Sequence, residues 1–184
     1  MEAGSCGLHI SIEEPCLLPT AIAHPDVTRI YLDSCGFGPE TWKAAVQACH
    51  DNAKQCSLML PHIFRTEAET YFRKHIDALK GAGFDELVVK SLDEITFLRE
   101  NGLGDIPLVS DANLYVLNHL AREQMEDLGI SRMTLPLELN SRELETPEQM
   151  KTVLDAFADQ FLHGEETRDP FKDFTRGHFK RGVE

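Results

Sequence analysis

The sequence predicts an α/β protein built on a parallel sheet of five or six strands. Short β-branched runs alternate with amphipathic helical segments, and the strong runs begin near residues 28, 57, 86, 107 and 131, the spacing of βα units. These runs are also nearly continuous in apolar residues, as expected for strands buried on both faces. An open doubly wound sheet and a (β/α) barrel both satisfy this pattern. A complete eight-fold barrel typically needs about 250 residues, and the chain has 184.

The first third of the chain supplies two strong strands and a weaker one. TRIYLD (28–33) and SLML (57–60) are the strong strands, and LHISI (8–12) is the weaker candidate. Gly38 and Pro39 are placed to open a helix between the two strong strands. The apolar face of this helix consists of Trp42, Ala45, Val46 and Cys49, at the i, i+3, i+4, i+7 spacing of a helix.

A helix follows the strand at 57–60. Thr66 and Glu69 have the spacing of a capping box, so we expect a helix that starts at Thr66 and ends near Gly81 or Gly83. The helix should lead directly into the next strand.

ELVVK (86–90) is that next strand, and a second capping box follows it. Ser91 and Glu94 form this box, and Asn101–Gly102 is the predicted end of the helix. The middle of the chain therefore repeats the βα unit.

PLVS (107–110) and SRMTLP (131–136) are the last two predicted strands, and the helix between them ends at Gly129. The apolar residues of that helix are Leu117, Leu120, Ala121, Met125 and Leu128. Beyond it, TPEQMKTVLDAF (146–157) predicts a helix capped by Thr146. We expect one domain over residues 1–145, with this helix and a basic tail at 146–184 packing on it.

Composition and charge exclude several classes of protein. A net charge of −13 argues against broad binding to nucleic acid or anionic membranes, although residues 168–184 carry five basic residues against three acidic ones. No apolar stretch approaches the roughly 18 residues of a membrane span. The five cysteines form no CxxC pair. We therefore expect a cytoplasmic protein with free thiols and no membrane association.

Polar residues follow the predicted strands at their carboxyl ends, where α/β proteins hold their sites. Histidine, arginine and carboxylates there suggest general acid–base chemistry, and the candidate catalytic residues are His62, Arg65, Asp111 and Glu138. Amides and charges beside them suit an anionic or polyhydroxylated ligand, and the candidate binding residues are Asp33, Lys90, Asn113, Asn118 and Asn140. The alternative role for Asp111, Asn113 and Asn140 is capping of the helices that follow.

Several of these segments resemble the peptidase U32 family. The resemblance rests on LMLPHIFR, ELVVKSLDE, PLVSDANLYVLN, GISRMTLPLELN and TRGHFKRGVE, in that order, and covers the chain from about Arg29 to Glu184. It is closest to the C-terminal portion of the large members, which are often called collagenase-like proteases. The resemblance implies a TIM-like (β/α) barrel, here incomplete, with five or six strands.

The resemblance also implies a cofactor in longer relatives. Family members typically carry a segment with several cysteines after the LPLELN-type strand, and these cysteines hold an iron–sulfur cluster. Here LNSREL passes at Glu145 directly into TPEQMK, as if that segment were deleted. Since a cluster needs four suitably placed ligands, we expect no cofactor and no metal in this chain.

Three functions are compatible with the sequence. The resemblance implies peptide hydrolysis, or more plausibly oxygen-independent hydroxylation of RNA bases or quinone precursors, with Arg176 and Arg181 as RNA contacts. The second is a non-catalytic lobe that completes a barrel with a partner chain, or with itself, through an open sheet edge. The third is a metal-free hydrolase or a small-molecule binder at the strand ends. For the basic tail, the alternative to RNA binding is a solvated segment that packs back on the barrel.

Overall fold

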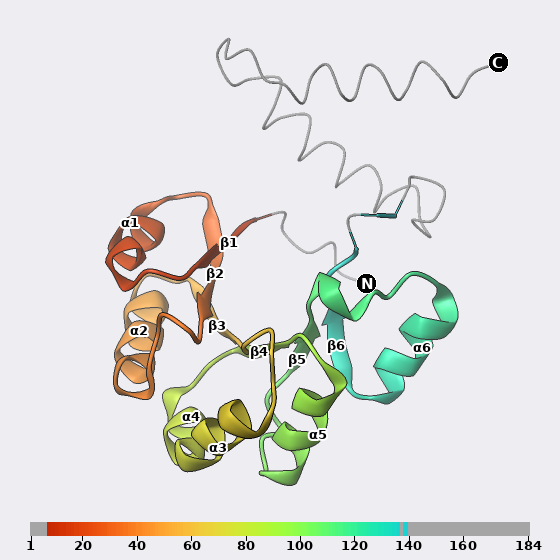
Figure 1. Ribbon diagram of the computed structural model, residues 1–184. Coiled ribbons are helices and arrows are strands. Elements are labelled where there is room, and N and C mark those ends of the chain that lie inside the picture. Colours follow the sequence, from red (N-terminus) through yellow and green to blue (C-terminus); the bar gives the residue numbers. More distant parts are fainter. Residues whose placement is uncertain (1–6, 137, 140–184) are drawn as a thin grey trace, which may run out of the picture. The chain divides into compact units, whose positions relative to one another are not determined.

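Six parallel strands form one sheet in the order β1-β2-β3-β4-β5-β6 (Figure 1). The structure is a computed structural model that describes residues 7–136, 138 and 139. The strands are β1 Leu8–Ile12, β2 Val27–Asp33, β3 Gln55–Met59, β4 Glu86–Val89, β5 Leu108–Ser110 and β6 Ile130–Met133. The α-helices are α1 Leu18–Ala23, α2 Pro39–Asp51, α3 Thr66–Lys74, α4 Ile76–Ala82, α5 Leu92–Glu100 and α6 His119–Asp127. Two short 3₁₀ helices are η1 Pro15–Leu17 and η2 Ala112–Leu114.

The strand order decides between the two architectures that the sequence left open. A doubly wound sheet reverses its strand order at a switch point, whereas here each strand pairs in parallel with the next one along the chain. Right-handed crossovers without a reversal place every helix on the same side of the sheet, as Figure 1 shows for α1 to α6. The fold is an incomplete (β/α) barrel, as the resemblance implied.

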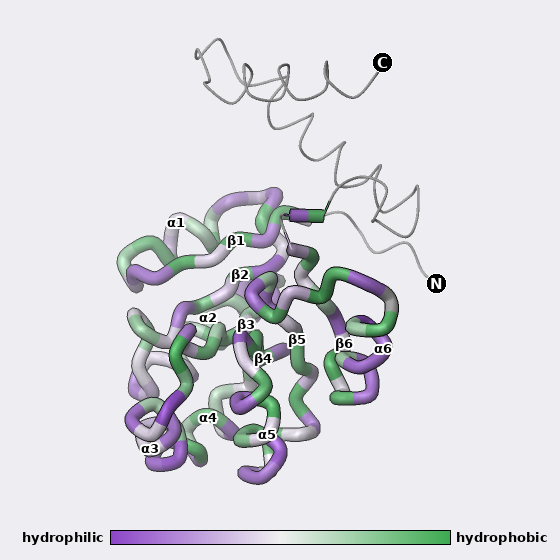
Figure 2. The backbone as a smooth tube through the Cα atoms, turned by 45° about the vertical axis from the view of Figure 1, so that its right-hand side comes forward, coloured by the Kyte–Doolittle hydropathy of each residue, from purple (hydrophilic) through white to green (hydrophobic). Residues whose placement is uncertain are grey.

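The hydrophobic core lies between the strands and the helices. Ile30 of β2, Leu58 of β3 and Leu87 of β4 are fully buried there, and Figure 2 shows hydrophobic stretches along the central strands. Trp42 of α2 is also fully buried, and its indole N–H donates to the Phe37 carbonyl at 2.7 Å. The predicted apolar face of α2 is therefore confirmed.

The opposite side of the strands, which we call the inner face, carries several charged and hydrogen-bonding residues. Strand side chains alternate between the two faces, so the residues between the core positions point away from the helices. A barrel interior is normally filled by branched apolar side chains. Here the inner face carries the polar residues Arg29, Tyr31, Asp33, Gln55, Ser57, Glu86 and Arg132, beside the apolar Met59, Val88 and Val109.

The predicted helix from Thr66 is two helices, and its predicted capping box is wrong. Arg65 occupies the N-cap position with an extended backbone and no side-chain cap bond. Thr66 is therefore already the first helical residue, and the spacing of the box is shifted by one. Glu69 pairs instead with Arg73 at 2.6 Å. The chain bends at His75 (φ −109°, ψ 19°) before α4, which packs against α2.

The second predicted capping box is confirmed. The Glu94 amide donates to Ser91 Oγ at 3.4 Å, and the Ser91 amide donates to Glu94 Oε2 at 3.3 Å. At the other end of this unit, the backbone of Gly102 has a positive φ of 72°, which favours glycine. Local sequence therefore determines both ends of α5.

The helix before β6 begins later than its apolar pattern predicts. Asn118 caps α6, so Leu117 lies outside the helix, and Leu120 is 64% exposed. Met125 alone of the predicted apolar set is buried, while Ala121 and Leu128 are half-buried against the core. None of the described helices is long and apolar enough to cross a membrane.

Candidate functional site

Asp33 and Lys90 lie together at the carboxyl edge. By this edge we mean the carboxyl ends of β2 to β6 and the loops that follow them. Lys90 Nζ lies 3.5 Å from Asp33 Oδ2, and the two side chains are 1% and 23% exposed. Asp33 ends β2 and Lys90 follows β4, so the pair spans the intervening strand β3. The two residues are far apart in sequence, and the parallel register alone joins them.

Lys90 is the most unusual group at this edge. Its Nζ is buried and has no hydrogen-bond acceptor among the described residues. An ammonium carries three donors, and burying them without acceptors is costly even when the charge is paired. A buried cation of this kind is suited to binding an oxygen atom of a ligand.

The Glu94 carboxylate is hydrogen-bonded to the backbone of Lys90. Its Oε2 accepts the Lys90 amide at 2.5 Å, and Oε1 has no partner among the described residues. Glu94 is fully buried, and this burial raises its pKa to about 7, against the opposing effect of hydrogen bonds from the Lys90 and Ser91 amides. Glu94 therefore positions Lys90 and is itself poised to titrate near neutral pH.

A second group at the carboxyl edge joins three of the predicted residues. Asn113 Nδ2 lies 3.4 Å from His62 Nδ1 and also contacts Asp111 Oδ1. Asp111 Oδ1 accepts the Asn113 amide at 3.0 Å and so caps η2, as the alternative interpretation anticipated. The Asn113 side-chain amide lies between His62 and Asp111 and contacts both. This arrangement suits ligand binding better than a direct proton transfer from the histidine to the carboxylate.

The remaining predicted site residues are dispersed. Arg65 is exposed at the N-cap position of α3, Glu138 is exposed, and Asn118 caps α6 by accepting the Ala121 amide at 2.9 Å. Asn140, Arg176 and Arg181 lie outside the described residues, so their proposed roles stay predictions.

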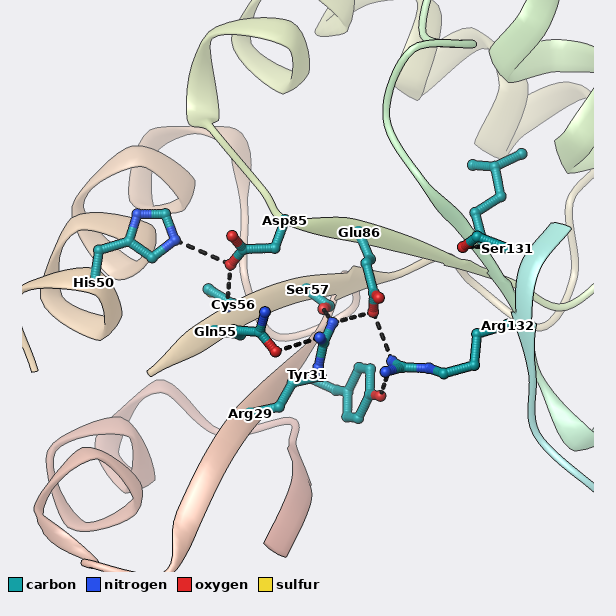
Figure 3. A network of polar contacts seen from close by, with 11 residues as sticks. Arg29, Tyr31, His50, Gln55, Cys56, Ser57, Asp85, Glu86, Ser131 and Arg132 are labelled. Atoms are coloured by element: carbon teal, nitrogen blue, oxygen red, sulfur yellow. Dashed lines mark hydrogen bonds and ion pairs between the residues drawn. The ribbon is translucent and has the colours of Figure 1, made fainter. Parts of the chain in front are cut away.

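The structure also shows a polar cluster that the sequence reasoning missed (Figure 3). Glu86 Oε2 accepts hydrogen bonds from both Arg29 Nη1 and Arg132 Nη2, the second at 2.7 Å. Arg132 Nη2 also donates to the Tyr31 hydroxyl at 2.9 Å, and Arg29 Nη1 donates to Ser57 Oγ at 3.2 Å. We call Arg29, Tyr31, Ser57, Glu86 and Arg132, together with Gln55, the inner-face cluster.

A signal for this cluster is present in the sequence. In TRIYLD, the residues Arg29, Tyr31 and Asp33 alternate with apolar ones, which is unusual for a strand of a buried parallel sheet. Glu86 is the polar first residue of β4, the next strand but one. The alternation indicates a polar second face, although it does not reveal which partners meet.

The described cysteines do not fit an iron–sulfur cluster. Cys49 and Cys56 lie buried in the core, where the Cys56 thiol donates a hydrogen bond to Cys49 that lowers the pKa of Cys49 and raises that of Cys56. Cys16 and Cys35 are exposed elsewhere. In the described part of the chain, no three His, Cys, Asp or Glu side chains are grouped so that they could hold a metal ion. These four thiols therefore provide no cluster site.

Comparison of the fold with solved structures supports a barrel. A crystal structure of a protein assigned as a fructose-1,6-biphosphate aldolase from Coccidioides immitis matches with a TM-score of 0.55 at 14% sequence identity. The match covers 83% of this chain and 66% of that chain, so the present chain spans less than two thirds of its length. At this identity the likeness concerns the fold alone.

Sequence comparison provides the family. No curated protein sequence matches the chain. The family model described as Peptidase family U32 matches residues 28–167, which is well over half of the chain. This match includes nearly all of β2, the strands from β3 to β6, the carboxyl edge and the inner-face cluster. The chain therefore belongs to peptidase family U32.

Proposed function

We propose that the chain is the substrate-binding part of a U32-family enzyme, and that it holds a polar or anionic group of the substrate at the carboxyl edge. The observation that carries this proposal is Lys90, a buried ammonium with one carboxylate neighbour and no hydrogen-bond acceptor among the described residues. Asn113 and His62 add an amide and an imidazole at the same edge. This combination suits a ligand with several oxygen atoms.

Such a site could serve peptide hydrolysis or a hydroxylation reaction. Peptide hydrolysis, which the family name suggests, needs a nucleophile activated by a base or a metal. Among the described residues, His62 contacts the side-chain amide of Asn113, and no hydroxyl or thiol is hydrogen-bonded to the His62 ring. The geometry therefore supports substrate binding more than it supports hydrolysis, and we favour an enzyme of the hydroxylation or RNA-modification type in a cytoplasmic setting.

The RNA version of this proposal has a direct test. A labelled single-stranded RNA oligonucleotide should bind with an affinity that falls steeply as salt is raised. Replacement of Arg176 and Arg181 should reduce the salt slope by about one for each phosphate that the protein no longer neutralises. A flat salt response in the wild-type protein would count against RNA as the substrate.

The carboxyl edge is tested by Lys90→Met. Methionine keeps much of the volume and removes the charge, so binding of labelled RNA or labelled gelatin peptide, measured by fluorescence anisotropy, should weaken at least about tenfold, equivalent to about 1.4 kcal/mol. Lys43→Met, on the exposed side of α2, is the matched control and should bind as the wild type does.

Stability provides an independent readout of the same site. Because buried ion pairs contribute little net stability, the double variant Asp33→Asn/Lys90→Met should unfold at the same or a higher urea concentration than the wild type. If the double variant is several kcal/mol less stable, the pair serves the fold and the proposal fails. Equal probe binding by Lys90→Met and the wild type would also reject it.

The second candidate is a lobe that completes its barrel with another chain. One observation favours it: β1 and β6 are the outer strands of the sheet in residues 7–139, and a complete barrel has eight strands. Outer strands present unpaired amides and carbonyls that can pair with another strand. A lobe of this kind should associate with a second copy or with a partner chain as its concentration rises.

A further inference from the structure

The inner-face cluster carries more positive than negative charge. Two guanidinium groups, Arg29 and Arg132, share the single carboxylate oxygen Glu86 Oε2. Gln55 and Ser57, which also accept from Arg29, are neutral. The contacts therefore leave one positive charge without a carboxylate partner within the cluster.

Both arginines have donors left over. Arg29 is 5% exposed, and its Nε is buried with no hydrogen-bond partner among the described residues. The side chain of Arg132 is 40% exposed, and its contacts to the described residues all go through Nη2. A guanidinium has five N–H donors in a planar fork that matches carboxylate and phosphate oxygens. The fork of Arg132 is thus held by Tyr31 and Glu86 on one side and open on the other.

A histidine lies beside the cluster. His9 of β1 lies edge-on to the Tyr31 ring, with 6.1 Å between the ring centres. Partial burial lowers the pKa of His9, and the charges of Arg132 and Arg29 lower it further. The lowered pKa favours the neutral form of the His9 ring beside the cluster.

We propose that the inner-face cluster is a binding site for a small anionic group, a carboxylate or a phosphate, with the open fork of Arg132 as its main contact. This site is distinct from the carboxyl edge. Arg29 precedes Asp33 by four residues on the same strand, which corresponds to about 13 Å along the sheet. Together the two sites line opposite halves of the inner face, so one elongated ligand or two separate ones can be accommodated.

Inorganic phosphate and acetate are the probes for this site. Isothermal titration at low ionic strength should show saturable binding of at least one of them, with sodium chloride at matched ionic strength as the reference. Preference for phosphate or for acetate then distinguishes the two ligand chemistries. Binding no stronger than that of chloride would overturn the proposal.

Arg132→Gln should lower the affinity at least about tenfold, equivalent to about 1.4 kcal/mol. Because Arg132 is partly exposed, we expect this variant to fold. Arg73→Gln is the matched control, since Arg73 is an exposed arginine that pairs with a glutamate on α3. It should bind as the wild type does, and equal losses in both variants would show non-specific attraction and reject the site.

Two further variants test the sign of the expected change in affinity and the place where the anion binds. Glu86→Gln removes the competing carboxylate and should strengthen anion binding, so a weakening in a folded Glu86→Gln protein would contradict the proposal. If Lys90→Met abolishes binding while Arg132→Gln does not, the anion binds at the carboxyl edge; that result rejects the present inference and supports the proposed function instead.

Discussion

Lys90 and Glu94 are two charged residues that are buried, although protein interiors favour apolar side chains. Lys90 is 6% exposed and Glu94 is fully buried, although lysine and glutamate are almost never buried unless they are paired. Glu94 is retained because its carboxylate satisfies two amides at the start of α5. Among the described residues, Asp33 is the carboxylate within 4 Å of Lys90 Nζ, at 3.5 Å. At the residue scale, Glu94 has a structural explanation and Lys90 points to a ligand.

The buried carboxyl of Glu94 should make stability depend on pH. Its folded pKa of about 7 lies above the ordinary value of 4.5, so between these values the folded protein binds more protons than the unfolded one. The contribution is fully present below pH 4.5 and is lost as pH rises through about 7. The difference amounts to at most about 3 kcal/mol.

Glu94→Gln should remove this dependence, because glutamine can keep both cap bonds and does not titrate. Urea unfolding of both proteins from pH 4.5 to 8 should show the wild type losing stability relative to the variant as pH rises. Parallel curves for the two proteins would show that Glu94 does not titrate in this range.

At the scale of elements, two segments with the same capping signature behave differently. Thr66 and Glu69 match the motif in sequence, yet Arg65 occupies the N-cap position of α3 without a side-chain cap bond, while Ser91 and Glu94 form the complete box at α5. The difference lies in where the chain leaves the preceding strand. Five residues separate the end of β3 from Arg65, and Lys90 is the one residue between β4 and Ser91. A short connection fixes the first helical residue more firmly than a longer one.

Thr66 and Ser91 therefore form a matched pair for mutagenesis. Ser91→Ala should lower the free energy of unfolding by about 1 kcal/mol, because the Glu94 amide loses its acceptor. Thr66→Ala should change it by less than about 0.5 kcal/mol, since no cap bond is removed. Urea unfolding at one pH measures both, and equal losses would mean that Thr66 caps α3 in solution.

At the scale of the whole molecule, the sheet has a covered side and a polar side. The helices bury the apolar face of β2 to β6, while the inner face carries charged and hydrogen-bonding residues beside the buried Val88 and Val109, where a complete barrel has mainly branched apolar residues. A polar interior lowers the stability available from burial and keeps the inner face suitable for polar ligands.

Open strand edges should also affect association. If β1 and β6 remain the outer strands, their unpaired backbone groups favour pairing with another copy of the chain. Sedimentation velocity over a wide concentration range should then show a sedimentation coefficient that rises with concentration. A constant monomer value would argue that the edges are protected and would weaken the barrel-completing alternative.

The sequence by itself determined the repeating βα units, the cap of α5, the buried face of α2 and the family. These features depend on residues within about one helical turn of each other, or on motifs read in order. It also placed polar residues at the strand ends, and among these the tertiary structure joins Asp33 to Lys90 and Asn113 to His62 and Asp111.

Only the tertiary structure decided the strand order, the bend at His75 and the inner-face cluster. Arg29 and Glu86 are 57 residues apart, and Glu86 and Arg132 are 46 apart. Their contact depends on the register of the five neighbouring strands β2 to β6 and on which face each side chain takes. Local hydrogen bonding and hydrophobic periodicity carry no information about register between strands, so these contacts exist only once the sheet has formed.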